Sequence, residues 1–216
     1  MIKIATNILE NCWLIIATIC VLSISLIIGD SAIGVASAIS GIICVIFTAQ
    51  GKLSAYYFGI INCILYSIVA YQQTLYGETL LNALYYLPLQ FVGFKIWKQN
   101  LNKENKVCPL SLSVTKKIYL FAGIVAGTLL LGAILQKYGD EIPFIDAFTT
   151  VSSVIAMTLS AKRYSEQWYI WITINMFSIY MWLERYQTNG ENIATLMMWS
   201  VFLLNSFYGL YKWTRK

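Results

Sequence analysis

One stretch of the chain places aromatic rings and an amide on a single helical face. Residues 167–183 carry no charged side chain. Within them, steps of three or four residues align Trp168, Trp171, Asn175, Ser178 and Trp182. Indole faces stack on flat rings, and a carboxamide both donates and accepts hydrogen bonds. A cationic ring would gain further from cation–π attraction. This face therefore predicts a site for a small planar solute that carries polar substituents.

Other apolar segments contribute polar side chains to the same predicted site. Asn82, Tyr86 and Gln90 recur every four residues and so share one helical face. Pro88 lies on the same helix and predicts a kink, because proline frees a carbonyl one turn earlier. Single amides inside two further segments complete the set. The candidate solute-binding residues are Asn62, Asn82, Tyr86, Gln90, Trp168, Trp171, Asn175, Trp182 and Asn205.

Two plainer roles compete with solute binding for these residues. Amides inside a membrane also join helices, with each bond contributing about 0.6–2 kcal/mol. Tryptophans near the ends of segments form a belt at the membrane surface. The belt is an equal alternative for Trp168, whereas Trp171 and Asn175 lie deeper and favour a solute site. Helix joining remains open for each amide.

The residue types also exclude several kinds of chemistry. The chain has no histidine, which excludes histidine metal sites and histidine general bases. The five cysteines include no CxxC pair. No charged residue lies at the centre of an apolar segment, whereas proton- and sodium-coupled carriers commonly use buried carboxylates. We therefore expect no enzyme activity, no metal and no cofactor, and we expect uncoupled movement of the solute down its gradient.

The elements that hold these residues are predicted to be transmembrane helices. Hydrophobic residues make up 58% of the 216-residue chain and charged residues 12%, about half the charged share of a soluble domain. A bilayer core of about 30 Å requires roughly 20 apolar residues per helix. Barrel strands would be shorter and would alternate in polarity. The eight predicted spans are residues 11–29, 31–49, 53–71, 78–97, 118–136, 143–161, 166–185 and 192–213.

The basic residues orient these eight helices. With the N-terminus in the cytoplasm, thirteen of the fifteen Lys and Arg residues fall on the cytoplasmic side, as the positive-inside rule requires. Both termini are therefore predicted to be cytoplasmic. The net charge of +5 comes from these loops and predicts no nucleic-acid partner. Residues 11–29 are too long for a signal-peptide core, so we expect a retained helix.

The two halves of the chain resemble each other. The stretches 76–78 and 189–191 are 113 residues apart, as are Asn62 and Asn175, and Gly93-x-x-x-Trp97 matches Gly209-x-x-x-Trp213. A single linker helix between the units would make them parallel, with the site near mid-membrane where they meet. The predicted parts are an extra N-terminal helix (1–30), a first three-helix repeat (31–97), a flexible cytoplasmic loop (98–117), a linker helix (118–137) and a second three-helix repeat (143–216).

Several stretches resemble the PnuC family of nicotinamide riboside transporters. In the first half these are GKLSAYYFGIIN (51–62), LYGE (75–78), LLNALYYLPLQ (80–90) and GFKIW (93–97). The second half is similar through Trp168-Tyr-Ile-Trp171, Asn175 and Gly209-x-x-x-Trp213. The resemblance covers roughly residues 31–216, and the first-half stretches are its most distinctive part.

The resemblance implies an all-α membrane fold like that of the SWEET sugar carriers, but full-length. It also implies a homotrimer in the bacterial inner membrane. The implied activity is facilitated diffusion of nicotinamide riboside, a vitamin B3 precursor, with retention by phosphorylation in the cytoplasm. Thiamine or another vitamin heterocycle is the alternative solute, since an indole stacks on any of these rings. An integral membrane enzyme or a non-transporting assembly protein is the alternative from another class.

Overall fold

The chain folds into long helices in a computed structural model that describes residues 15–16, 18–24, 27, 29–139, 142–189 and 193–215. The elements are α2 (Ala32–Ala49), α3 (Ala55–Gln72), α4 (Tyr76–Leu80), the π-helix η1 (Leu81–Tyr86), α5 (Leu87–Lys98), α6 (Val114–Lys137), α7 (Pro143–Ala161), α8 (Gln167–Asn189) and α9 (Ile193–Thr214). Within the described residues the extended structure is limited to three isolated bridges. The all-α prediction is therefore confirmed.

The helix bounds agree closely with the predicted spans from residue 31 onward. The largest shifts are of four residues, at the beginning of α6 and at the end of α8. Helix α6 begins at Val114 because the Ser113 side chain caps it by accepting a hydrogen bond from the Lys116 N–H at 3.4 Å. Helices α2, α6, α7 and α9 are long and apolar enough to cross a membrane by length and composition. The leading segment is helical at 15–16 and 18–24, and most of the rest of 1–30 lies outside the described residues.

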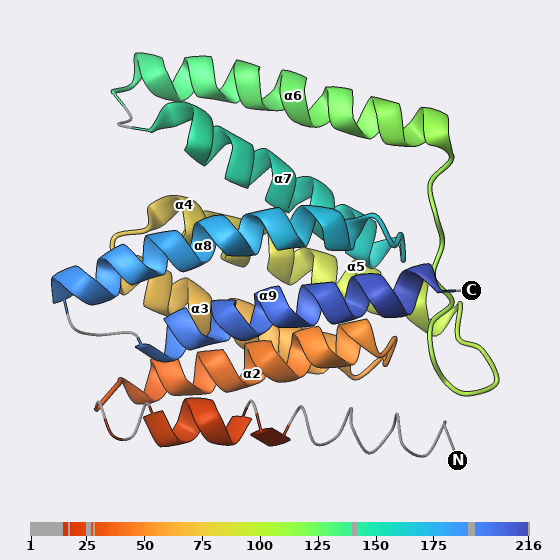
Figure 1. Cartoon of the computed structure of the whole chain (residues 1–216), viewed down its shortest axis with the longest axis horizontal. Coiled ribbons are helices and arrows are strands. Elements are labelled where there is room, and N and C mark those ends of the chain that lie inside the picture. Colours follow the sequence, from red (N-terminus) through yellow and green to blue (C-terminus); the bar gives the residue numbers. More distant parts are fainter. Residues whose placement is uncertain are drawn as a thin grey trace.

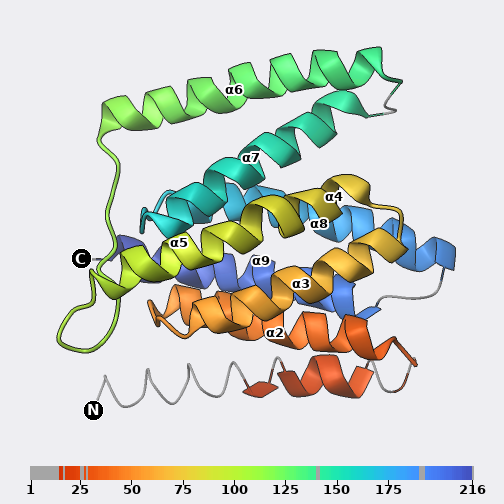
Figure 2. The same ribbon diagram turned by 180° about the vertical axis from the view of Figure 1, so that it is seen from behind.

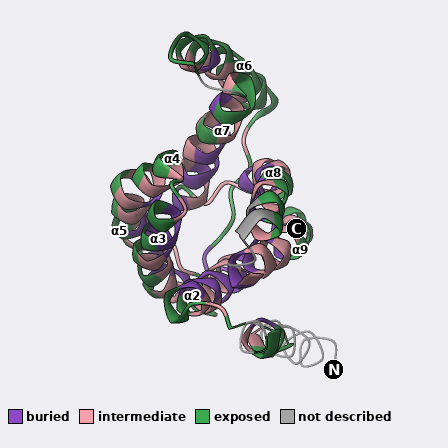
Figure 3. Cartoon of the chain, turned by 90° about the vertical axis from the view of Figure 1, so that its left-hand side faces the viewer, coloured by how far each residue is buried: buried purple, intermediate pink, exposed green. Residues whose placement is uncertain are grey.

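Six helical columns close into a ring. Helix α2 packs on α3, α3 on the column α4–η1–α5, α5 on α7, α7 on α8, α8 on α9, and α9 back on α2. Figure 3 looks along this ring, and Figure 2 shows the side formed by α3, α4 and α5. Helix α6 lies outside the ring against α7 (Figure 1). The ring therefore gives the chain an interior face that is separate from its outer surface.

Two glycines permit the close approach of helices at one end of the ring. A Cβ atom on Gly93 of α5 would lie 2.5 Å from the Tyr56 ring of α3, and one on Gly209 of α9 would lie 2.6 Å from the Trp168 indole of α8. Because no side chain larger than hydrogen fits there, the rings pack directly on the backbone of the neighbouring helix.

The kink expected at Pro88 takes the form of a π-helical turn. Pro88 lies in the first turn of α5, directly after η1. The N–H of Leu87 donates to the Asn82 carbonyl five residues earlier, which widens the turn. The Asn82 side chain in turn donates to the Glu78 carbonyl at 2.9 Å. The widened turn is thus stabilised by one of the predicted site residues.

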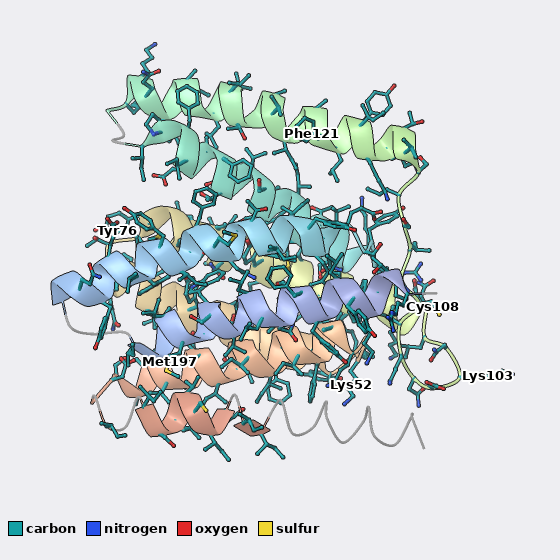
Figure 4. All side chains as sticks on the ribbon, in the orientation of Figure 1. Lys52, Tyr76, Lys103, Cys108, Phe121 and Met197 are labelled. Atoms are coloured by element: carbon teal, nitrogen blue, oxygen red, sulfur yellow. The ribbon has the colours of Figure 1, made fainter. Side chains whose placement is uncertain are left out.

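The stretch between α5 and α6 is not a free loop. Figure 4 shows its residues Lys103 and Cys108 at the same end of the bundle as Lys52, with Tyr76 at the other end. Backbone hydrogen bonds join this stretch to both halves of the ring, at Gly51 and at Arg163. The polar composition of this stretch predicted flexibility. The sequence did not reveal these backbone hydrogen bonds, because their partners lie far away in the chain.

Glu166 fastens α6 to the beginning of α8. Its Oε1 atom accepts hydrogen bonds from the Ser111 hydroxyl at 2.8 Å and the Leu112 N–H at 3.1 Å, and lies 2.9 Å from Lys117 Nζ. Partial burial acts to raise the pKa of the Glu166 carboxyl, but the hydrogen bonds from Lys117, Ser111 and the backbone outweigh it. The net pKa lies below its usual range.

We expect Glu166→Gln to lower the stability of the purified protein at pH 7 by roughly 1–3 kcal/mol, because it removes charge-assisted hydrogen bonds. A carboxyl group with a lowered folded pKa stabilises the fold above its unfolded pKa of about 4, and this stabilisation is lost as the pH falls through the folded value. The difference in melting temperature between variant and wild type should therefore shrink below pH 4. Glu184→Gln, at an exposed carboxylate, is the matched control. A difference that stayed constant down to pH 3 would contradict the prediction.

Candidate functional site

A cavity lies inside the ring of helices. Its empty volume is about 900 Å³, which includes space open to solvent. Side chains from α2, α3, η1, α5, α7, α8 and α9 line it. Among the lining residues that the structure describes there is no Asp, Glu, Lys or Arg. The cavity is therefore a neutral pocket with aromatic, amide and hydroxyl groups on its wall.

Seven of the nine predicted site residues lie on this wall, from four different elements. They are Asn62 of α3, Asn82 and Tyr86 of η1, Gln90 of α5, and Trp168, Trp171 and Asn175 of α8. These positions span more than a hundred residues of sequence, and the ring brings them to one place. Their proximity fits a shared site.

Trp182 and Asn205 lie away from the cavity and join helices. The Trp182 indole N–H donates to the Tyr66 hydroxyl at 3.1 Å, and the Asn205 amide donates to the Val45 carbonyl at 2.8 Å. The stripe from Trp168 to Trp182 rises about 21 Å along α8, and only its first half reaches the cavity wall. For Asn205 the structure matches the helix-joining alternative that was open for the amides, and Trp182 joins helices in the same way.

Asn62 and Asn82 are held by backbone carbonyls at the edge of the cavity. The Asn62 amide donates to the Ser37 carbonyl at 2.9 Å, and the Asn82 amide donates to the Glu78 carbonyl at the same distance. These bonds fix the amide planes by occupying one N–H of each. Both side chains therefore combine a structural contact with a place on the cavity wall.

The amides of Gln90 and Asn175 are buried and oriented on opposite sides of the ring. Gln90 lies over Gly59, where a Cβ atom would be 2.5 Å from its Oε1 atom. The Asn175 amide donates to the Ser206 hydroxyl at 2.9 Å, while its Oδ1 atom has no hydrogen-bond donor among the described residues. Asn175 therefore presents a fixed acceptor on the cavity wall.

Aromatic contacts orient the rings of the cavity wall, and one of them joins the two halves of the chain. The rings of Tyr86 and Trp171 meet edge to face with centroids 6.2 Å apart. The Trp168 indole meets Trp213 in the same manner at 5.6 Å. Edge-to-face pairs hold rings in a defined orientation. The cavity wall thus offers ring faces in fixed positions beside the amides.

Two residues that sequence analysis did not select also contribute to the wall. Tyr56 and Gln167 line the cavity, and the Tyr56 hydroxyl and Gln167 Oε1 are buried without a hydrogen-bond partner among the described residues. Gln167 directly follows a charged residue and so resembled a membrane boundary. The Tyr56 position lay within the stretch that resembles the PnuC family, which was the one available signal.

Five buried polar atoms on the wall thus lack partners within the described part of the chain: Tyr56 Oη, Gln167 Oε1, Trp168 Nε1, Asn175 Oδ1 and Trp199 Nε1. Folded proteins pair the great majority of their buried polar groups. Two amide acceptors, two indole donors and a hydroxyl are complementary to a solute that carries both donors and acceptors. The arrangement can bind such a solute, and it contains no group that would neutralise a strong charge.

Comparison with known proteins agrees with this geometry. Residues 31–215 match the family model described as nicotinamide mononucleotide transporter. The nicotinamide riboside transporter PnuC of Neisseria mucosa is 38% identical over 192 residues, which cover 86% of this chain and 73% of that protein. The protein of the same name from Haemophilus influenzae is 38% identical over 189 residues, covering 86% of this chain and 80% of that protein.

A solved structure has the same fold. The crystal structure of the vitamin B3 transporter PnuC matches with a TM-score of 0.86 at 36% identity, covering 95% of this chain and 90% of that chain. The match extends over nearly the whole chain. Identity at this level over most of both chains, together with the family model, is sufficient to assign the family. The chain therefore belongs to the PnuC family of multi-pass bacterial inner-membrane transporters.

Proposed function

We propose that this chain carries nicotinamide riboside across the bacterial inner membrane by facilitated diffusion. The observation that supports it most directly is the neutral cavity, which presents fixed indole and tyrosine rings beside unpartnered amide oxygens. A pyridinium ring suits the aromatic faces, and its carboxamide and ribose hydroxyls suit the amides. The named relatives are nicotinamide riboside transporters.

The same cavity favours the riboside over its phosphorylated form. The family model is described by the mononucleotide, whose phosphate would bring about two negative charges at neutral pH. Binding such a group away from water requires arginine, lysine or a set of backbone donors. No described residue on the cavity wall carries a positive charge. Entry of the phosphate would therefore leave it unpaired.

Phosphorylation after entry completes the proposed cycle. No charged side chain lies on the described cavity wall that could couple movement to protons or sodium ions. A carrier without coupling only equalises the electrochemical potential of the solute on the two sides. Net uptake then depends on conversion of the solute in the cytoplasm to a form that the neutral cavity rejects. Phosphorylation is such a conversion.

The proposed architecture is eight spans, with two parallel three-helix repeats (31–97 and 143–216) around the linker helix. Equivalent hydrogen bonds support the repeat. The Trp97 indole of α5 donates to the Ser160 carbonyl near the end of α7 at 3.1 Å, and the Trp213 indole of α9 donates to the Ala49 carbonyl at the end of α2 at 3.0 Å. In each bond the third helix of one repeat contacts the first helix of the other.

The termini are proposed to be cytoplasmic, on the side where Lys52, Lys103 and the C-terminal end of α9 lie (Figure 4). The chain is also proposed to assemble as a homotrimer. Among the described helices α6 packs on α7 alone, apart from the Lys117–Glu166 ion pair at its beginning, and it exposes large apolar side chains such as Phe121 and Leu130. This surface suits lipid or another copy of the chain.

Solute selectivity tests the proposed substrate. We expect detergent-purified protein to bind nicotinamide riboside with quenching of tryptophan fluorescence, and to bind the mononucleotide at least tenfold more weakly, because its phosphate finds no cation in the cavity. Calorimetric titration with the riboside, the mononucleotide, thiamine and riboflavin provides the measurement. Binding of thiamine in place of the riboside would change the substrate, and equal binding of the mononucleotide would overturn the charge argument.

A pair of asparagine variants separates solute binding from helix joining. Asn175→Leu removes an acceptor on the cavity wall, whereas Asn205→Leu removes a buried bond between α9 and α2 away from it. Both should lower stability by about 0.6–2 kcal/mol. In proteoliposomes, only Asn175→Leu should reduce riboside uptake at least tenfold per folded protein. Similar uptake in the two variants would show that Asn175 only joins helices.

A further inference from the structure

The turns α2–α3 and α7–α8 lie at the same end of the ring and have the same backbone geometry. Gly51 and Arg163 occupy equivalent positions with φ of 71° and 69°. The Lys52 N–H donates to the Phe47 carbonyl and the Tyr164 N–H donates to the Leu159 carbonyl, both at 2.9 Å. Each turn thus ends the first helix of one half of the chain. The carbonyl of Gly51 or Arg163 then points outward from the turn.

Residues 98–113, which we name the strap, bind both turns through their backbone. The Val107 N–H donates to the Gly51 carbonyl and the Leu110 N–H donates to the Arg163 carbonyl, both at 2.8 Å. Only two residues, Cys108 and Pro109, lie between the two anchor residues. Three extended residue steps reach about 10–11 Å, so the two turns can move apart only as far as this short segment allows while both anchors hold.

The anchor on the second half is the stronger. The Ser165 N–H donates to the Leu110 carbonyl at 2.8 Å, and Arg163 Nη1 donates to the Cys108 carbonyl at 3.2 Å. Glu166 adds its bonds to Ser111 and Leu112. By comparison, the first-half anchor consists of the Val107–Gly51 bond, the bridge between Lys52 and Lys106, and the Val107 side chain.

Val107 is the one buried side chain of the strap. It packs in a cluster that contains Ala49, Tyr56, Trp97, Trp168 and Trp213. Trp97 and Trp213 meet in this cluster, with ring centroids 5.8 Å apart. Tyr56 and Trp168 also form part of the cavity wall. A continuous set of packed rings therefore lies between the cavity and the strap and obstructs this end of the ring.

We propose that the strap is a latch that holds this end of the transporter closed, and that release of Val107 from Gly51 is the step that lets the end open. The unequal anchors set the order, because the first-half anchor has fewer hydrogen bonds. The strap then remains attached to the second half through Leu110 and Glu166 while the two turns separate. The aromatic cluster loses Val107 at the same step, and the end opens when the Trp97–Ser160 and Trp213–Ala49 hydrogen bonds between the halves then break.

Labelling of the cavity thiols tests this latch without reference to any solute. Cys44 and Cys63 line the cavity, and Cys108 is exposed on the strap and reports which side of a vesicle carries it. In a Cys12→Ala, Cys20→Ala, Cys108→Ala background, a membrane-impermeant maleimide is added to vesicles with the strap side outward. Val107→Ala and Val107→Pro should raise the labelling rate of Cys44 and Cys63 at least threefold. Lys103→Ala, at an exposed strap residue, should leave it unchanged.

A reversible crosslink tests whether fixing the strap to the first turn keeps this end of the ring closed. Lys52 and Lys106 pair in an antiparallel bridge, where Cα atoms about 4.5–5.5 Å apart match disulfide geometry. In the same background, oxidised Lys52→Cys, Lys106→Cys protein should show at least tenfold slower cavity labelling and riboside uptake, both restored by reductant. Lys52→Cys alone is the control. Equal labelling in the Val107 and Lys103 variants, or labelling unaffected by the crosslink, would overturn the latch. Slower labelling without any riboside uptake in the reduced protein would keep the latch and overturn only the proposed solute.

Discussion

The closed ring of helices is the constraint on which the rest of the structure depends. A bilayer offers no hydrogen bonds, so every polar side chain at membrane depth must face protein or water. Contacts of α2 with α9 and of α5 with α7 close the ring. Closure allows amides such as Asn175 to keep an unpaired oxygen without exposing it to lipid. An open arrangement of the same helices would place these groups at an apolar surface.

Closure of the ring relies on tryptophan at the end that carries the strap. Trp97 and Trp213 each donate to a backbone carbonyl of the opposite half, and they meet each other at the centre. Indoles suit this place because one ring supplies a large apolar contact and a single hydrogen-bond donor. Gly93 and Gly209 complete the closure of the ring, because they let aromatic rings approach the backbone of α5 and α9. The same contacts that join the halves therefore also separate the cavity from this end.

The π-helical turn shows how a local irregularity can serve both fold and site. Pro88 removes a backbone donor, and the widened turn before it takes up the mismatch. The Asn82 side chain donates to the Glu78 carbonyl one turn earlier. Asn82 and Tyr86 thereby leave the regular helical spacing and reach the cavity wall together with Gln90. Irregular turns of this kind frequently occur at functional sites.

Hydropathy, charge and helical period in the sequence were enough to determine the all-α class, the helix bounds from residue 31 and seven of the cavity residues. All three follow from properties that recur along a single helix. Tertiary structure alone decided which part of each face meets the cavity. Trp182 and Asn205 share faces with site residues, yet Tyr66 and Val45 lie opposite them and take their hydrogen bonds. The strap was equally hidden in the sequence. Its anchors are backbone N–H and carbonyl groups, which every residue possesses, so only the positions of Gly51 and Arg163 in space could reveal them.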